Sequence, residues 1–195
     1  MAMKKKVLLV VIALVLVACC FAACRNYDDM LDTINDALQA DYSEVQINVI
    51  TKIHGTELTG VYILTFEEND KVVVDYRYEE LNEISIDGNN SFKHVVSGTV
   101  TLQNGVVVDG DESVYNVPLE FTGINFKQSF FDNIKVTKSS FQADVKTPTG
   151  FLGNSSFSAK NMHVNAFLDG KLLSRMDVNY VSDGAEVSLV YTFTA

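Results

Sequence analysis

Cysteine, tryptophan and proline are scarce in this chain. It contains no Trp and two Pro in 195 residues, and its three Cys all lie within the first 24 residues. No disulfide can therefore form beyond residue 24, so the fold must depend on its hydrophobic core. A chain of about 170 residues is long enough for this, because it buries roughly 70% of its unfolded surface.

Basic residues are scarce as well. Three of the 15 Lys and Arg precede residue 24, so residues 25–195 carry 12 basic and 25 acidic side chains, a net charge of -13. This composition lacks the basic face that neutralises phosphates, which excludes nucleic acid as a partner. The chain is 47% hydrophobic, which excludes a disordered or collagen-like protein, and its length favours a single domain.

Motifs for catalysis and metal binding are also missing. The sequence contains no His-Glu-x-x-His, no Gly-x-Ser-x-Gly and no phosphate-binding glycine loop. His54, His94 and His163 lie in strand-like segments without a second His or Cys at metal-ligand spacing, and we interpret His94 as a hydrogen-bonded structural residue. The oxygen-rich turns at 87–90 and 109–112 lack the full spacing of a calcium loop. We therefore expect no enzyme, no cofactor and no metal.

The N-terminus has the layout of a secretory signal. Lys4, Lys5 and Lys6 precede an unbroken apolar run from Val7 to Cys24, which matches a basic region followed by a hydrophobic one. The 18 residues of this run are also just long enough to span a bilayer. A cleaved signal and an uncleaved anchor therefore both fit, and either one places the body of the protein outside the cytoplasmic membrane.

The end of this run resembles bacterial lipoprotein precursors, whose signal ends in a lipobox of the form Leu-Ala-Ala-Cys. Two tetrads fit, LVAC at Leu16–Cys19 and FAAC at Phe21–Cys24. The first has the preferred Leu, whereas cleavage before Cys24 leaves a polar start instead of an apolar stub. The resemblance implies a signal peptide over residues 1–23, lipid attachment at Cys24 or at Cys19, and a mature chain anchored to the cell membrane by its N-terminal lipid.

The mature chain begins with a helical pattern and continues with strand patterns. Apolar residues recur with helical spacing at Tyr27, Met30, Leu31, Ile34 and Leu38. Alternation with a period of two follows in residues 45–53, 58–66, 72–78 and 92–102, and strand-like pieces lie at 117–121, 134–145, 156–168, 171–181 and 186–194. Hairpin turns are expected at Asn104-Gly105, Asp169-Gly170 and Asp183-Gly184.

These patterns predict an α+β fold that is mostly β, in a single extracytoplasmic domain over residues 24–195. It consists of an N-terminal amphipathic helix and a large curved antiparallel sheet, or open half-barrel, of about eight to ten strands. Eight strands are about 38 Å wide, whereas a helix of about 13 residues is about 20 Å long and about 10 Å thick. The sheet must therefore curl around the helix, close into a barrel or split into two layers, and the first two arrangements leave an apolar concavity.

This order of elements over residues 27–195 resembles the LolA/LppX-type fold, an unclosed β-barrel whose concave apolar face binds acyl chains. The resemblance is architectural and carries no binding residue over. Strand parity suggests that Tyr62, Leu64, Phe66 and Tyr76 line the concave face. Our hypothesis is a membrane-tethered, non-catalytic protein that binds a lipid or another hydrophobic ligand. The alternative is an adhesion or protein-interaction module with a fully packed core and an unidentified protein partner.

Overall fold

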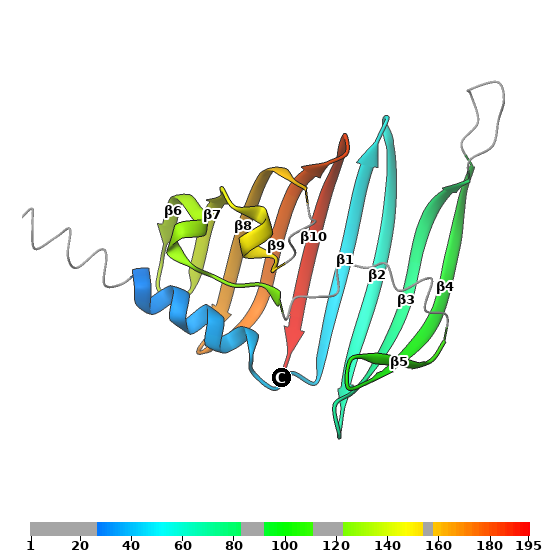
Figure 1. Cartoon of the computed structure of the whole chain (residues 1–195), viewed down its shortest axis with the longest axis horizontal. Helices are drawn as coiled ribbons and strands as arrows, with labels where there is room; N and C mark the ends of the chain where they lie inside the picture. Colours follow the sequence, from blue (N-terminus) through cyan, green and yellow to red (C-terminus); the bar gives the residue numbers. More distant parts are fainter. Residues whose placement is uncertain (1–26, 83–91, 111–122, 154–157) are drawn as a thin grey trace, which may run out of the picture.

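The structure is a computed structural model that describes residues 27–82, 92–110, 123–153 and 158–195 (Figure 1). The proposed signal peptide with Cys19 and Cys24 lies outside these residues, as does the strand-like piece expected at 117–121. Among the helices of the described ranges, none is both long enough and apolar enough to cross a membrane.

Ten strands of the described chain form one open antiparallel sheet, which confirms the fold class expected from the sequence. The strands are β1 (Glu44–Ile53), β2 (Thr56–Glu67), β3 (Lys71–Asn82), β4 (Phe92–Gln103), β5 (Val106–Asp109), β6 (Phe131–Val136), β7 (Ser140–Val145), β8 (Lys160–Asp169), β9 (Leu172–Ser182) and β10 (Ala185–Thr194). Their order in the sheet is β5-β4-β3-β2-β1-β10-β9-β8-β7-β6. The chain thus runs from the centre of the sheet to one edge, crosses to the other edge and returns to the centre.

Left-handed backbone conformations close the hairpins. Asn104 and Gly105 have φ of 53° and 76°, and Asp183 and Gly184 have φ of 50° and 82°. Positive φ at both central residues is the pattern of a type I′ turn, whose twist matches that of the strands. The turn expected at Asp169-Gly170 lies one residue further along, because Asp169 still pairs with Leu172 at the end of the β8–β9 ladder.

Residues 134–145 were expected as one strand-like piece, and this was wrong. They belong to a hairpin, in which β6 ends at Val136 and β7 begins at Ser140. The intervening turn contains no Gly, Pro or Asn, so nothing in its composition signals a reversal. Two interactions between Thr137 and Ser140 close the turn instead. Their hydroxyls lie 2.7 Å apart, and the Thr137 backbone N–H donates to the Ser140 carbonyl.

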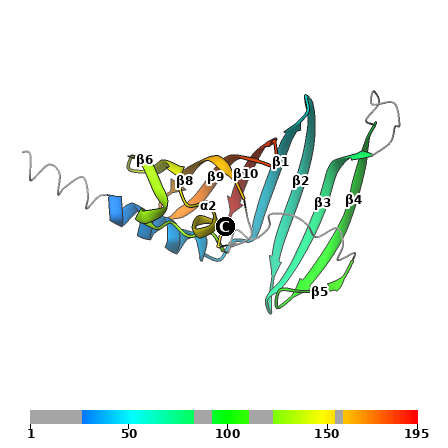
Figure 2. The same cartoon turned by 45° about the horizontal axis from the view of Figure 1, so that its top comes forward.

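The helix over residues 27–38 lies against the β6–β10 half of the sheet, whereas β2–β5 extend away from it (Figures 1 and 2). Its apolar face is buried, as the helical spacing predicted; the buried residues are Met30, Leu31, Ile34, Ala37 and Leu38. They belong to the same core cluster as inward-facing side chains of β1 and of β6–β10. The sheet therefore wraps around the helix on one side, and the described edges β5 and β6 do not pair with each other.

A cluster of four phenylalanine rings packs beside the helix, and the sequence analysis did not foresee it. Phe126, Phe131, Phe141 and Phe151 meet mostly edge to face, with ring centroids 5.1–5.6 Å apart. Two short helical segments carry the chain past this cluster, η3 (Gln128–Phe130) and α2 (Pro148–Phe151). The Asn35 side chain ties the cluster to the helix, because it accepts from the Phe126 N–H at 2.8 Å and donates to the Phe126 carbonyl at 2.9 Å.

Tyr42 joins the helix to the sheet at the C-terminal end of the helix. Its buried hydroxyl donates to the Ala37 carbonyl at 2.9 Å and accepts from the Leu173 N–H at 2.9 Å. Its ring packs on Phe193, with centroids 5.0 Å apart. Burial raises the pKa of Tyr42, against the opposing effect of the Leu173 hydrogen bond, so the hydroxyl remains neutral. One side chain thus links the helix, β9 and β10 just before β1 begins.

We expect Tyr42→Phe to lower the free energy of unfolding by about 2 kcal/mol, because it leaves the buried Leu173 N–H without this partner. The Ala37 carbonyl loses one of its two donors and keeps the Ala40 N–H. Tyr27→Phe is the matched control, since the Tyr27 hydroxyl has no hydrogen-bond partner among the described residues and its removal should be neutral or slightly stabilising. Denaturant unfolding of the full chain measures both. Equal losses in the two variants would contradict the role of Tyr42.

Candidate functional site

The four residues expected to line a concave face do lie together on the inner face of β2 and β3. Tyr62 is paired with Tyr76 across the two strands, and Leu64 and Phe66 follow with the same parity. Tyr62 and Leu64 are 7% and 5% exposed, so they belong to the core, whereas Phe66 and Tyr76 are half-buried. Strand parity therefore grouped these side chains correctly, and their role as ligand contacts stays a prediction.

Tyr78 has the parity expected from the alternation over residues 72–78 and completes a group of three tyrosines, although it was not named among the expected ligand contacts. The rings of Tyr62, Tyr76 and Tyr78 have centroids 6.0–6.5 Å apart. Burial, followed by the charges of Tyr78, Glu80 and Tyr76, raises the pKa of Tyr62 to about 12. Further along the same face, Glu80 lies 3.3 Å from the Nε2 atom of His94. This half of the inner face therefore combines clustered aromatic hydroxyls with one partly exposed polar pair.

Two of the three histidines have a carboxylate partner among the described residues. His94 pairs with Glu80, in keeping with its interpretation as a hydrogen-bonded structural residue. His163 Nδ1 lies 2.5 Å from an oxygen of Asp144, whose other oxygen accepts from Asn133 at 2.6 Å. The hydrogen bonds from Asn133 and His163 lower the pKa of Asp144, which stays ionised. His54 lies in the β1–β2 turn with φ of 49°, so its expected placement in a strand was wrong.

Within the described residues, His, Cys, Asp and Glu side chains nowhere gather in groups of three or more that could hold a metal ion. The oxygen-rich turn at 87–90 and residues 111 and 112 of the second turn lie outside this part of the chain. The Asp109 carboxylate of the second turn accepts the neighbouring Gly110 N–H at 3.0 Å, which is the local hydrogen bond expected of a turn residue.

A cavity of about 1070 Å³ opens where the beginning of the described helix faces the β6–β7 and β8–β9 turns. Its walls are largely apolar, formed by Tyr27, Met30, Ile134, Val136 and Leu168. Its remaining lining is polar, formed by Asp29, Thr33, Gln128, Thr137, Lys138, Gly170 and Lys171. None of the four residues named from strand parity contributes to it. The sequence contained no signal for this cavity, because the position of β6 beside the helix depends on the strand order.

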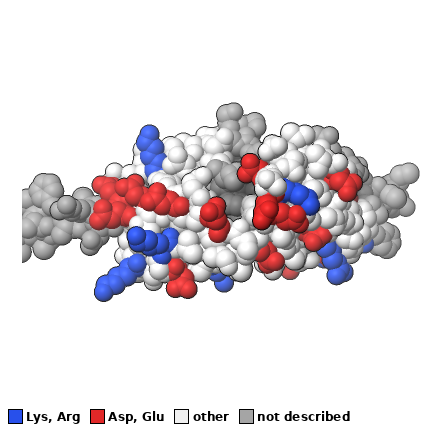
Figure 3. Space-filling model, turned by 90° about the horizontal axis from the view of Figure 1, so that it is seen from below, with Lys and Arg blue, Asp and Glu red and all other residues white. Residues whose placement is uncertain are grey.

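Two lysines stand at this cavity without acidic partners. Lys138 and Lys171 are exposed, and neither forms an ion pair with a carboxylate of the described chain. Five other cations pair with neighbouring carboxylates, namely Lys52, Lys71, Lys93, Lys146 and Arg175. The remaining described cations, Arg77, Lys127, Lys135 and Lys160, also form no ion pair with a described carboxylate, but they do not line this cavity. Figure 3 shows how acidic side chains form a band along one side of the molecule. The cavity therefore combines apolar walls with free positive charge on a strongly acidic protein.

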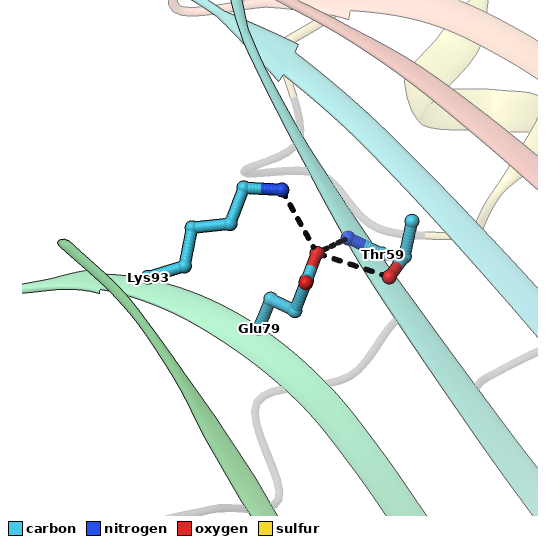
Figure 4. Close-up of polar contacts among 3 residues, drawn as sticks. All are labelled: Thr59, Glu79 and Lys93. Carbon is cyan, nitrogen blue, oxygen red and sulfur yellow. Dashed lines mark hydrogen bonds and ion pairs between the residues drawn. The ribbon is translucent and has the colours of Figure 1, made fainter. Parts of the chain in front are cut away.

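The outer face of the sheet carries a polar cluster centred on Glu79 (Figure 4). One oxygen of Glu79 on β3 accepts from the Thr59 N–H at 2.8 Å, from the Thr59 hydroxyl at 3.0 Å and from Lys93 at 3.3 Å. The β2–β3 ladder begins at Gly60, so the carboxylate satisfies the first N–H beyond it. These bonds from Thr59, with a smaller contribution from Lys93, lower the pKa of Glu79 below its ordinary value of 4.5.

Comparison with known proteins identifies no family. No protein-family model matches the chain, and no curated protein matches it. Among solved structures, it is similar to a dehydratase domain from the CurF module of curacin polyketide synthase, with 8% identity over 80% of this chain and 76% of that one, and a TM-score of 0.23. Two trans-AT polyketide synthase dehydratase domains from Brevibacillus brevis give 8% and 11% identity, cover 86% and 87% of this chain and 80% and 84% of theirs, and have TM-scores of 0.21 and 0.19. TM-scores this low carry no argument about function.

We expect Glu79→Gln to lower the unfolding midpoint at pH 7, with the difference from wild type shrinking as the pH falls below 4.5. The pKa of Glu79 is lower in the folded chain than in the unfolded one. Its stabilising effect is therefore fully present above the unfolded value and is lost as the pH falls through the folded value. Thermal unfolding at pH 3 to 7 measures this.

Glu186→Gln is the matched control, because the Glu186 side chain makes no hydrogen bond or ion pair with a described residue. It should leave the midpoint nearly unchanged at every pH. A difference between the Glu79 variant and wild type that persists undiminished at pH 3 would show that lost packing, and not the ionised carboxylate, causes the destabilisation.

Proposed function

We propose that this protein is a membrane-tethered extracytoplasmic lipoprotein that binds a lipid or another hydrophobic ligand without catalysing a reaction. The observation that carries the proposal is the open cavity of about 1070 Å³ between the helix and the β6–β7 and β8–β9 turns. Its volume is at the upper end of small-molecule sites, which are typically about 300–1,000 Å³ and mostly apolar. The surrounding walls of Met30, Ile134, Val136 and Leu168 suit an aliphatic ligand.

Burial of an acyl chain in this cavity supplies a large gross free energy. Each buried methylene group contributes about 0.8 kcal/mol, so about ten groups contribute about 8 kcal/mol. Association consumes at least about 4 kcal/mol of this in lost translational and rotational freedom. The remainder corresponds to a dissociation constant of about 1 mM. A longer chain or an additional contact with the polar part of the ligand is therefore needed for tight binding.

The position of the cavity suits a ligand that comes from the membrane. Tyr27 lines the cavity and follows Cys24 by three residues, which span at most about 10 Å when fully extended. A lipid attached to Cys24 would therefore hold the cavity close to the bilayer surface, and attachment at Cys19 would lengthen this tether by five residues. In either case the tether keeps the acidic domain near anionic headgroups that would otherwise repel it.

An interaction module remains the second candidate, and the edge strand β5 favours it. Val106 and Val108 on this strand are 65% and 62% exposed, and β5 is the last strand at one side of the described sheet. Exposed edge strands with apolar side chains can pair with a strand of another protein. This function does not require an occupied cavity, so ligand labelling of the cavity distinguishes the two candidates.

We expect Val136→Asn to weaken binding of a photoreactive fatty acid about tenfold, because the substitution places an amide in the apolar wall of the cavity. The measurement uses the full chain purified in a non-ionic detergent. The protein is irradiated with increasing concentrations of a diazirine-bearing fatty acid, and mass spectrometry of the peptides locates and quantifies the label.

Val190→Asn is the matched control. Val190 is also half-buried, but it lies on the outer face of the sheet between Asn48 and Asp177 and away from the cavity. This variant should label like the wild type. Absence of label from the peptides around Ile134–Val136 and Leu168 in the wild-type protein, even at saturating probe, would refute the proposed function.

The lipid anchor can be tested separately. We expect Cys24→Ser to prevent attachment of lipid, so that the protein leaves the membrane fraction, whereas Cys19→Ser should leave attachment intact. The mass of the mature N-terminal peptide reports the modified residue directly. The reverse pattern would assign the anchor to Cys19, and an unmodified peptide that begins at Met1 would refute lipidation altogether.

A further inference from the structure

We propose that the cavity selects an amphiphile with an anionic head, a carboxylate or a phosphate on an acyl chain, and that Lys138 and Lys171 bind this head. The proposal rests on the proposed function and names the class of ligand. It is carried by the two unpaired cations that line the same cavity as the apolar walls. A neutral hydrophobic ligand would form no ion pair with these lysines. A free anion without an acyl chain would bury no apolar surface against the walls.

The two lysines are held near each other by the fold. Lys138 lies in the β6–β7 turn and Lys171 in the β8–β9 turn, and both contribute to the lining of the same cavity. A backbone hydrogen bond joins the β6–β7 turn to the end of β8, just before the β8–β9 turn, because the Leu168 N–H donates to the Ser139 carbonyl at 2.8 Å. Both lysines therefore lie at the same edge of the cavity, although they are 33 positions apart in the sequence.

The β6–β7 turn is itself fixed by local hydrogen bonds. The Thr137 N–H donates to the Ser140 carbonyl at 2.9 Å, and the Ser139 N–H donates to the Thr137 hydroxyl at 3.3 Å. Lys138 thus projects from an ordered turn, and its flexible side chain can adapt to the head of a ligand. A preorganised backbone reduces the entropy that a binding site loses when the ligand arrives.

The charge balance at the cavity favours an anion. Asp29 is the one acidic residue in its lining, so the two lysines leave an excess of one positive charge. The rest of the chain repels anions, because residues 25–195 carry a net charge of -13. Neither lysine has a carboxylate partner in the described chain that a ligand would have to displace. An anionic head therefore gains new ion pairs there without breaking existing ones.

The apolar wall residues are more buried than the two lysines. Met30 and Leu168 are almost fully buried, and Ile134 and Val136 are half-buried beside them. An acyl chain that enters past the lysines would lie on these four side chains and keep its head at the opening. This arrangement satisfies both parts of an amphiphile, because the chain leaves water and the charged head stays partly hydrated between its cationic partners.

The test compares photoreactive probes of equal chain length on the full-length protein in a non-ionic detergent. One probe is a diazirine fatty acid, the second is the corresponding neutral alcohol, and the third is a lysophosphatidic acid that carries the same chain. We expect the acid to reach half-maximal labelling of the cavity peptides at a concentration about two- to tenfold lower than the alcohol does. Two partly exposed ion pairs between the lysines and the head account for a preference of this size. Raising the salt to 0.5 M should reduce this preference.

The double variant Lys138→Gln and Lys171→Gln should remove the preference while labelling by the alcohol continues. Lys52→Gln with Lys160→Gln removes the same number of charges elsewhere on the surface and should retain the preference. Stronger labelling by lysophosphatidic acid than by the fatty acid points to a membrane phospholipid as the source of the head. Stronger labelling by the fatty acid points to a free fatty acid, and either result supports recognition of the anionic head.

Two results would overturn the inference. Equal labelling of the wild-type cavity by the acid and the alcohol would show that the lysines do not select the head, while the proposed hydrophobic-ligand function would stand. A preference that survives in the Lys138 and Lys171 double variant would place the head elsewhere. A failure of all three probes to label the cavity would instead refute the proposed function itself, so the two failures are distinguishable.

Discussion

The helix over residues 27–38 has to cover an inner face that is ten described strands wide. A helix of this length extends about 18 Å, whereas ten strands extend about 48 Å. The helix therefore covers the β6–β10 half, and the phenylalanine cluster around Phe126 covers the region beside it. The large cavity lies beside this cover, where the beginning of the described helix faces the two turns that carry Lys138 and Lys171. The limited extent of the helix and the phenylalanine cluster thus determines both which part of the inner face is core and where the candidate site lies.

Local patterns in the sequence predicted most of the elements, because each of those patterns has a physical cause within a few residues. The spacing from Met30 to Leu38 placed the buried face of the helix, and Asn104-Gly105 placed the β4–β5 hairpin. The β6–β7 hairpin was missed, because its turn is closed by Thr137 and Ser140 hydroxyls without a glycine. The order of the strands could not be derived, since it depends on contacts between distant segments.

The candidate site was less predictable than the fold. Strand parity correctly placed Tyr62 and Tyr76 on one face, but parity does not reveal which part of that face the helix covers. Val136 is an example. In the sequence it is an ordinary apolar strand residue, and it lines the cavity only because the strand order places β6 beside the start of the described helix. The two lysines are equally inconspicuous in the sequence, and they are brought to one cavity only by the strand order and by the hydrogen bond between the β6–β7 turn and the end of β8.

The pairing of β1 with β10 extends from Glu44 and Thr194 to Lys52 and Glu186, and it joins the two halves of the sheet. Strand β1, the first strand of the described chain, thus receives its second neighbour only when β10 has emerged. The hairpins of each half involve local contacts and can form early, but the central seam closes a loop of most of the chain and must form late. Until then β1 presents an open edge that other chains can pair with. Synthesis of β10 is therefore also the step that protects the middle of the sheet from aggregation.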